Sequence, residues 1–400
     1  MKFGPRTLNF ERAAGASNLA PMFLYQHDNR YYAQANPGLV EIAATELTAL
    51  GARDPRRTGG GVAFEADLET LYRINYQARL VSRILAPLAE FDCRGPDDLY
   101  RGAKAVAWER IFSPGHTFAV FANVRSQTLR HSGFAALRVK DAVADRFRER
   151  LGRRPDVDPK SPDLWIALHL EADRATVSLD TSGGSLHRRG YRRQTVEAPI
   201  QETLAAAMVH WSQWDFRRPL VDPMCGSGTL VCEALMAACR IPSGYLRRRF
   251  GFAFLPDYDN RRWGAIKRHA DDQIRAVPAG LIQAGDIAPQ AVSAARTNLA
   301  LLPHGEKVRV RRCDLQDWHN LENALILCNP PYGIRLSRDT DLAGWYARLG
   351  DFLKRRCRGA TALIYFGQRA HLKHIGLRPT WKKPVPSGGL DGRLARFDMY

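Results

Sequence analysis

The sequence predicts an α/β protein built of two parts: a Rossmann-like, doubly wound parallel sheet in the C-terminal half, and a smaller α+β module of ferredoxin-like type before it. Three observations predict this fold class. From Pro199 onward, short apolar segments alternate with helical patterns. The glycine-rich stretch Asp222–Thr229 joins one such segment directly to a helix. Between Phe23 and Leu88, strand and helix patterns also alternate, over a shorter span.

The N-terminal elements follow from residue spacing and from turn residues. Residues 1–22 carry no apolar segment and are predicted to be a flexible tail. Apolar residues at three- and four-residue spacing predict a helix that Gly51 ends, and Asp67 is placed to cap a second helix. The predicted order is an extended segment Phe23–Tyr32, helix Leu39–Leu50, strand Val62–Glu65, a helix from Leu68 and strand Val81–Leu88.

The middle of the chain, residues 96–193, continues the α+β pattern. Three prolines make residues 153–162 a loop. The predicted elements are a helix from Pro96 to about Val106 with Trp108–Phe112 as a candidate extension, strand Thr117–Val124, helix Ala135–Leu151, a hairpin of Leu164–Leu170 and Ala175–Asp180, and a basic linker Ser182–Arg193. In the predicted helix Ala135–Leu151, the side chains expected to point inward are Leu137, Val139, Ala142, Val143 and Phe147.

The C-terminal half alternates strands and helices, which predicts a parallel sheet covered on both faces. The predicted strands are Pro219–Val221, Gly280–Ala284 (ended by Gly285-Asp286), Val308–Arg312, Ala324–Cys328 and Ala360–Phe366, with a closing hairpin in Leu377–Tyr400 around Gly388-Gly389. The predicted helices are Gln201–Trp211, one from Leu230, one after the basic excursion Ser243–Arg262, Pro289–Leu302 and Leu342–Arg356.

The charge of the chain predicts a polyanionic partner. The formal net charge is +18 and the isoelectric point is near 9.9. The basic residues form short clusters rather than one amphipathic helix, which favours nucleic acid over a membrane surface. Each cluster alone is more typical of a solvated face. The clusters are Arg146–Arg154, His187–Arg193, Arg247–Arg249, Arg261–His269 and Lys354–Arg358.

Neither a membrane span nor an export signal is predicted, because the chain has no run of 18 apolar residues and its first residues lack an apolar segment. The cytoplasm is the expected location. Seven scattered cysteines without a CxxC pair indicate reduced thiols. Cys225, Cys232 and Cys239 recur every seven residues and are interpreted as packing residues, so no metal site is predicted.

The stretch DPMCGSGT, Asp222–Thr229, is the candidate cofactor loop. Gly226 and Gly228 allow a sharp turn and a close approach to a ligand. The stretch has neither the GxxxxGK[ST] nor the GxGxxG phosphate-binding pattern. An acidic residue followed by GxG suits a cofactor with a cationic amino-acid end and a nucleoside, such as S-adenosylmethionine (SAM). A plain strand-to-helix turn is the structural alternative.

The motif NPPYG, residues 329–333, follows a predicted strand and is the candidate reaction site. A planar NH₂ group on a base or an amide needs two hydrogen-bond acceptors in its plane, and the Asn329 side-chain oxygen and the Pro330 carbonyl would provide them. Tyr332 is placed to stack on a base. These residues predict methyl transfer to an amine nitrogen.

Two aspartates extend the predicted cofactor site. Asp286 ends a strand, where a carboxylate can accept hydrogen bonds from ribose hydroxyls. Asp314 follows the next strand and could accept from an adenine amino group. Either one alone is an ordinary strand-end aspartate. The order Asp222, Asp286, Asp314, Asn329, each at a strand end, favours the functional reading of both.

Four segments carry a resemblance to a known family. They are DPMCGSGT, NPPYG, APIQETLAAAM (Ala198–Met208) and LDTSGGSLHRRGYR (Leu179–Arg192). Together they resemble the THUMP-containing SAM-dependent RNA methyltransferases. The match is best to the N-terminal half of RlmL-type proteins, which are guanine-N2 methyltransferases of large-subunit rRNA. The resemblance covers about residues 23–400.

The resemblance implies a methyltransferase sheet preceded by a ferredoxin-like and THUMP RNA-binding module. It implies catalytic roles for Asn329, Pro330 and Tyr332. The cofactor-binding residues it implies are Asp222, Cys225, Gly226, Ser227, Gly228, Thr229, Asp286, Asp314 and Asn329. The expected division is a ferredoxin-like part at 23–66, a THUMP region at 67–182, a linker and helix at 183–215 and a methyltransferase domain at 216–400. No second activity of the fused relatives is expected.

The expected reaction is methyl transfer from SAM to the exocyclic N2 of a guanine in 23S rRNA, as part of rRNA processing. Methylation of tRNA at guanine N2, or of RNA at adenine N6, is the alternative within the enzyme class. Glutamine side chains also react at such motifs, but the net charge of +18 argues against a protein substrate. An RNA-binding or ribosome-assembly factor that has lost catalysis is the alternative outside enzymology. The oligomeric state does not follow from the sequence.

Overall fold

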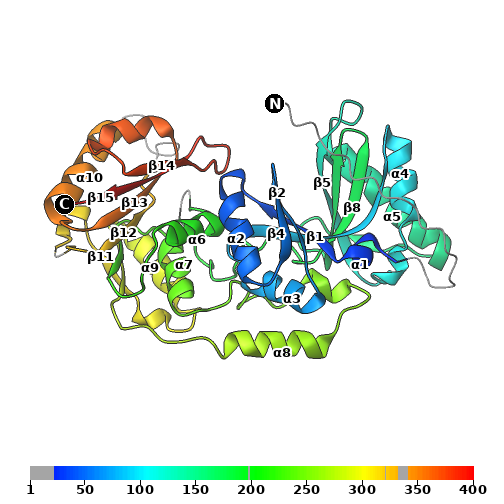
Figure 1. The fold of residues 1–400 in the computed structure, drawn as a ribbon, viewed down its shortest axis with the longest axis horizontal. Helices are drawn as coiled ribbons and strands as arrows, with labels where there is room; N and C mark the ends of the chain where they lie inside the picture. The colour runs from blue at the N-terminus through cyan, green and yellow to red at the C-terminus, as the bar shows by residue number, and fades with distance from the viewer. Residues whose placement is uncertain (1–21, 197–198, 320, 332–340) are drawn as a thin grey trace.

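The computed structural model describes residues 22–196, 199–319, 321–331 and 341–400. Two sheets lie side by side along the long axis of the molecule, the one from the N-terminal half on the right of Figure 1 and the one from the C-terminal half on the left. Nearly all of the predicted tail lies outside the described residues. Within them, no helix combines the length and the apolar character needed to span a membrane.

The first four strands form a ferredoxin-like unit. Their order in the sheet is β2-β3-β1-β4, and the chain order is strand, helix, two strands, helix, strand, which is the ferredoxin-like arrangement. The elements are β1 (Arg30–Ala35), α2 (Val40–Ala49), β2 (Arg53–Thr58), β3 (Gly61–Glu65), α3 (Leu68–Gln77) and β4 (Val81–Asp92).

The second unit extends the same sheet to eight strands, because β8 pairs antiparallel with β4. The predicted hairpin is confirmed as the antiparallel pair of β7 and β8. The elements are α4 (Pro96–Ala105), β5 (Thr117–Arg125), α5 (Ser132–Leu151), β6 (Asp156–Val157), β7 (Leu164–Glu171) and β8 (Arg174–Asp180).

The prediction of an extended Phe23–Tyr32 segment was wrong in its first part. Residues Leu24–Asp28 form the short helix α1, and β1 begins only at Arg30. The Gln26 side chain accepts a hydrogen bond from the Phe23 backbone N–H at 3.0 Å, which favours a helical turn. Asn29 then takes a left-handed conformation with φ 54° and turns the chain into the strand. The extended segment was predicted from its aromatic composition, and composition carries no information on caps of this kind.

Strand β2 was missed, and β6 falls in a segment predicted to be loop. All six residues of β2 are exposed, so its sequence RDPRRT has no apolar alternation to detect. It pairs only with β3, at the edge of the sheet. The two-residue β6 is likewise exposed. Both strands are defined by backbone pairing with a neighbour and not by burial.

The predicted inward face of α5 needs one correction. Val139, Ala142, Val143 and Phe147 are buried, but the Leu137 side chain is 55% exposed. Ala142 and Val143 follow Val139 by three and four residues, and Phe147 follows Val143 by four, so these side chains share one face of the helix. Leu137 is two residues before Val139 and therefore points to the opposite side.

The C-terminal sheet has seven strands in the order β11-β10-β9-β12-β13-β15-β14. The strands from β9 to β13 are parallel, and the closing hairpin adds β15 and β14 antiparallel at one edge. The strands are β9 (Leu220–Asp222), β10 (Ile282–Asp286), β11 (Arg309–Arg312), β12 (Leu325–Cys328), β13 (Thr361–Phe366), β14 (Trp381–Pro384) and β15 (Arg393–Asp398). The helices are α6 (Glu202–Trp211), α7 (Thr229–Ala238), α8 (Asn260–Asp271), α9 (Pro289–Leu299) and α10 (Leu342–Arg356).

Alternate residues of these strands enter two different cores. In β12, Leu325 and Leu327 belong to the large core that includes α6, α7 and α9, whereas Ile326 and Cys328 belong to a second core with α10. Successive side chains of a strand point to opposite faces, so both faces of the sheet are covered by helices. The predicted doubly wound fold is confirmed.

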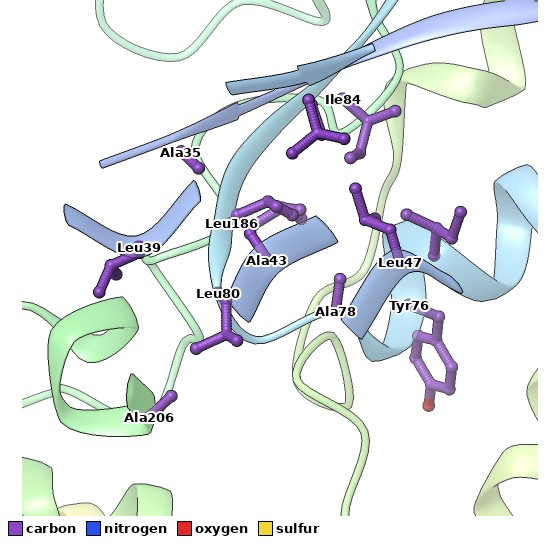
Figure 2. Close-up of a cluster of buried hydrophobic side chains, with 14 of the residues drawn as sticks. Ala35, Leu39, Ala43, Leu47, Tyr76, Ala78, Leu80, Ile84, Leu186 and Ala206 are labelled. Carbon is purple, nitrogen blue, oxygen red and sulfur yellow. The ribbon is translucent and has the colours of Figure 1, made fainter. Parts of the chain in front are cut away.

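The large core also crosses from one sheet to the other. Figure 2 shows apolar side chains of β1, α2 and β4 gathered with Leu186 from the segment after β8 and Ala206 from α6. Helix α8 lies against α3 of the N-terminal half, where the Tyr76 hydroxyl donates to Asp271 at 2.6 Å. The two halves therefore share one continuous hydrophobic core.

Candidate active site

Four predicted site residues lie where neighbouring parallel strands end. Asp222 is the last residue of β9 and Asp286 the last of β10. Asn329 follows β12 directly, and Asp314 lies two residues after β11. Since the strand order is β11-β10-β9-β12, the structure brings all four to one edge of the sheet. Ligands of doubly wound sheets bind outside this edge.

The glycine loop connects β9 to α7. Gly226 and Gly228 have φ values of 53° and 82°, in the left-handed region that glycine adopts without steric cost. A Cβ added to Gly228 would lie 3.0 Å from the Ala295 Cβ, so the loop packs closely on α9. The Cys225 N–H donates to the Gly285 carbonyl at 2.9 Å and ties the loop to β10. The loop is thus held by two neighbouring elements.

Asp286 braces this loop. One of its carboxylate oxygens accepts from the Gly226 N–H at 2.9 Å, and the other accepts from the Ala288 N–H at 3.0 Å. Only a ligand-binding role was predicted for Asp286. The bond to Gly226 connects the glycine loop to the predicted ribose-binding residue, Asp286, so these two parts of the predicted cofactor site are in direct contact.

Asp222 is almost fully buried at the base of the loop. Its carboxylate accepts from the Met224 N–H at 3.3 Å. Burial raises the pKa of Asp222 well above its ordinary value, and the nearby Asp286 carboxylate raises that pKa further. A cationic ligand group placed here would favour the ionised form of Asp222. The cationic amino-acid end of SAM fits this requirement.

Asp314 lies at the exposed end of the same edge. Its carboxylate accepts from the Gln316 N–H at 2.9 Å, and its own N–H donates to Asp317 at 2.8 Å. These bonds cap the single turn Leu315–Asp317 and fix the direction of the side chain. The predicted adenine contact is therefore placed on an ordered turn.

Asn329 presents an unsatisfied acceptor. Its side-chain oxygen Oδ1 is buried and has no hydrogen-bond partner among the described residues. A buried acceptor without a partner is costly, which makes it a candidate ligand-binding atom. Pro330 is buried beside it. Tyr332 lies outside the described residues.

The carboxylates of Asp222 and Asp286 lie close to the end of β12. Burial raises the pKa of the Cys328 thiol well above its ordinary value, and the charges of Asp222 and Asp286 raise it further. Because β12 pairs in parallel with β9, with Ile326 opposite Val221, Asn329 and the glycine loop follow the same ends of two adjacent strands.

Sequence reasoning missed two side chains that hold this site. The Tyr346 hydroxyl of α10 donates to the Pro331 carbonyl at 3.3 Å. Its ring is stacked against Phe366 and His371, with interplanar angles of 24° and 13°. The other is Asn298 of α9, whose buried side-chain amide donates a hydrogen bond to the Ser227 carbonyl of the glycine loop. An asparagine among the apolar positions of α9 was the only signal in the sequence.

The basic cluster His187–Arg193 is only partly solvated. Arg189 is buried and pairs with Glu233 of α7, Nε to Oε1 at 3.3 Å, and the Tyr191 hydroxyl donates to the same oxygen at 3.0 Å. Arg192 pairs with the largely buried Glu202 at 3.0 Å, whereas Arg188 and Arg193 are exposed. The buried members of the cluster therefore join the linker to the C-terminal half.

Cys225, Cys232 and Cys239 are all buried. In the described part of the chain, no three histidine, cysteine, aspartate or glutamate side chains are grouped as a metal would require.

Three family models match the chain in succession. Residues 30–85 match an RlmL ferredoxin-like domain, residues 93–180 match a THUMP domain, and residues 189–396 match the RMKL-like methyltransferase domain. The last match covers the glycine loop and the edge of the sheet that carries Asn329.

Curated relatives fall into two length classes. The protein is 41% identical over 384 residues to "Ribosomal RNA large subunit methyltransferase K/L" of Syntrophotalea carbinolica, covering 92% of this chain and 53% of the relative. The chain thus spans about half the length of the K/L relatives it matches. It is 38% identical over 371 residues to "Putative RNA methyltransferase slr0064" of Synechocystis sp., covering 92% of this chain and 97% of the relative.

Solved structures share the whole fold. The crystal structure of "SMU.472, a putative methyltransferase complexed with SAH" superposes with a TM-score of 0.80 at 29% identity, over 93% of this chain and 98% of that one. A "predicted N6-adenine-specific DNA methylase" from Listeria monocytogenes superposes with a TM-score of 0.80 at 27% identity, over 93% and 97% of the two chains. SAM is accordingly the methyl donor of this fold.

Proposed function

The chain belongs to the family of SAM-dependent methyltransferases that join an RlmL ferredoxin-like domain, a THUMP domain and an RMKL-like methyltransferase domain, and on this premise we propose that it methylates the exocyclic N2 amine of a guanine in 23S rRNA. The names of the K/L relatives support the large-subunit RNA. The net charge of +18 supports a polyanionic substrate. The cytoplasm, where rRNA is made in bacteria, is the proposed compartment.

The unpartnered Oδ1 of Asn329 carries the proposal. An exocyclic amine has two N–H groups in the plane of its ring. In the proposed complex one N–H donates to Asn329 Oδ1 and the other to the Pro330 carbonyl. Two such bonds localise the nitrogen lone pair and direct it out of the plane, which makes the amine a nucleophile. The buried acceptor supports this role because a ligand would satisfy it.

The remaining roles follow from position at the sheet edge. SAM supplies a sulfonium-bound methyl group. Asp222 would face its cationic amino-acid end, and the loop Cys225–Thr229 would follow its length. Asp286 would accept from the ribose hydroxyls and Asp314 from the adenine amino group. Asn329, following the neighbouring strand β12, would hold the target amine in line with the methyl group.

The proposed step needs no dedicated base. The amine nitrogen forms its bond to the methyl carbon as the carbon–sulfur bond breaks, and the proton leaves the nitrogen afterwards to solvent. The protein contributes alignment and the two acceptors. The target base must be unpaired or flipped out of a helix to reach Asn329. Tyr332 is proposed to stack on that base.

Asn329→Ala tests this role most directly. We expect the turnover number to fall by about a hundredfold or more, by analogy with the loss of a single transition-state hydrogen bond. SAM affinity, measured by calorimetry, should be largely kept. Glu322→Ala, an exposed substitution in the segment before β12 and so at the other end of that strand from Asn329, is the control for handling of the protein. Turnover close to wild type in Asn329→Ala would remove Asn329 from the mechanism.

The substrate is tested by mass spectrometry of nucleosides. In a strain without the gene, N2-methylguanosine should disappear from one position of 23S rRNA and return when the wild-type gene is restored. Loss of the mark from tRNA instead would support the tRNA alternative. Loss of N6-methyladenosine would support the adenine alternative, which the similarity to the Listeria protein keeps in view.

A non-catalytic RNA-binding or assembly role is the second candidate. In that case the protein would bind RNA, with an affinity that falls steeply as salt rises, but would not bind SAM. Calorimetric titration with SAM separates the two functions. The described side chains at the sheet edge favour the enzyme.

A further inference from the structure

Asn298 joins two segments that are distant in sequence. Its side chain is fully buried on α9. Its oxygen Oδ1 accepts from the backbone N–H groups of Arg193 and Gln194 at 2.9 and 3.1 Å. Its nitrogen Nδ2 donates to the carbonyls of Gln194 and Ser227 at 2.8 and 2.9 Å. One amide therefore holds both the linker and the glycine loop.

These four bonds use the whole capacity of the amide. A carboxamide offers two acceptor sites and two N–H donors. Asn298 has none left for a ligand, so it acts through the backbone it holds. Because the two segments are held by one rigid group, a shift of the linker changes the position of Ser227 in the cofactor loop.

The linker also touches the loop directly. A Cβ added to Gly226 would lie 3.2 Å from the Val196 Cγ2, so the Val196 side chain covers the Gly226 backbone. The Gly226 N–H is bonded to Asp286. The loop is thus held by the tip of β10 through one contact and by the linker through the other.

We propose that Asn298 is a positioning residue for SAM and that the linker residues Arg193–Val196 are a wall of the cofactor site. The inference rests on the proposed placement of SAM beside the glycine loop. The segment that leads out of the N-terminal half then contributes to methyl-donor affinity, although it contains none of the predicted cofactor-binding residues.

Asn298→Ala should weaken SAM binding at least tenfold. The substitution removes all four of these hydrogen bonds. The Gln194 N–H and the carbonyls of Gln194 and Ser227 lose their Asn298 partner, whereas the Arg193 N–H keeps its bond to the Tyr191 carbonyl at 2.8 Å. Without Asn298 the linker should move away from α9, which also releases Ser227. Calorimetry of the full chain with SAM measures the effect. The affinity for a 23S rRNA fragment should stay within twofold, because Asn298 makes no hydrogen bond to the N-terminal sheet, and the substitution leaves that sheet unchanged.

Asn75→Ala is the matched control. Asn75 is also fully buried, and its Nδ2 donates to the Leu71 carbonyl and the Thr181 hydroxyl at 3.0 and 3.1 Å. It lies on α3, in the other half of the molecule. Its loss should lower thermal stability to a similar degree and leave SAM affinity unchanged. Equal SAM affinity in the two variants would overturn the proposal.

Val196→Ala keeps the test valid if Asn298→Ala does not fold. Val196 is only partly buried, so its truncation should be tolerated. We expect SAM affinity about threefold weaker, and unchanged affinity would contradict the role of the linker. The measurement is independent of RNA methylation. A wild-type protein that binds SAM but methylates no guanine would refute the proposed function and leave this inference intact.

Discussion

The two sheets of the molecule place their polar side chains differently. In the seven-stranded sheet both faces are packed, and the functional candidates Asp222, Asp286 and Asn329 gather at strand ends. In the eight-stranded sheet one face packs against helices. Its other face carries the partly exposed, mutually contacting rings of Phe121 and Trp165, and this sheet also bears a groove of about 600 Å³ lined by other residues. The side chains that line this groove include the polar residues Tyr32, Gln34, Asn123, His169 and Thr176 and the charged residues Asp28, Arg30, Glu90, Arg125 and Glu171.

This difference separates a compact ligand site from a broad surface. Strand ends converge on one small volume, which suits a cofactor and a single base. A sheet face spreads its side chains over many strands and offers no such point of convergence. The charges of that face are largely paired within it, as between Arg83 and Asp180 and between Arg125 and Glu171. The comparison therefore assigns chemistry to one sheet and an extended contact area to the other.

The largest expected effect comes from breaking the junction between the two halves. Arg189→Ala removes one partner of an ion pair in which both side chains have zero exposure, and it leaves the buried Glu233 without the Arg189 guanidinium. Removing one member of a buried pair costs about 3–5 kcal/mol. Urea unfolding should show that loss, with both halves unfolding in a single transition because they share one core.

The exposed pair of Lys104 and Glu149 provides the control, since Lys104→Ala should cost less than about 1 kcal/mol. Two separate transitions in Arg189→Ala, with the first at wild-type stability, would show that the sheets fold independently. The shared core would then be a contact between finished domains.

A smaller effect is expected at the tight turn of the glycine loop. Gly228 has φ 82°, and an added Cβ would lie 3.0 Å from the Ala295 Cβ and 3.2 Å from its Cα. Gly228→Ala should cost about 2–3 kcal/mol and also weaken SAM binding, because the loop must move. Gly152 has φ 71° but open space around it. Gly152→Ala should cost only about 1 kcal/mol and leave SAM affinity unchanged. The difference between the two variants then measures the steric clash with Ala295 apart from the cost of a positive φ.

The same contrast explains what the sequence could predict. Strands β12 and β13 are buried on both faces, so ALILC and ATALIYF are continuous apolar runs with clear ends. Asn329, the residue directly after β12, was a predicted site residue, and the structure places it at the same ends of the parallel strands as Asp222 and Asp286. Strand β2 has no buried residue, and its six positions carry no hydrophobic pattern.

Contacts across the sequence were the part that could not be predicted. The bond from Gly226 to Asp286 spans 60 positions, and the bonds from Asn298 to the linker span more than 100. Local spacing carries no information on such pairs. The basic cluster around Arg189 was open to a solvated or an RNA-binding interpretation, because burial by a partner such as Glu233 is visible only in the fold.

Tyr346→Phe has the smallest expected effect and tests how rigid the strand ends must be. The Tyr346 ring would keep its stacking on Phe366, and the hydrogen bond from its hydroxyl to the Pro331 carbonyl would be lost. A single such bond contributes about 0.5–1.5 kcal/mol, which corresponds to a fall in turnover of about threefold to tenfold. SAM affinity should not change, since the Tyr346 hydroxyl bonds the segment after Asn329 and not the glycine loop. Tyr100→Phe loses a hydroxyl bond to Asp145 in the other half and should leave turnover unchanged. Equal turnover in both variants would mean that the backbone after β12 keeps its geometry without help from α10, and that the difference between the two sheets lies only in where their side chains point.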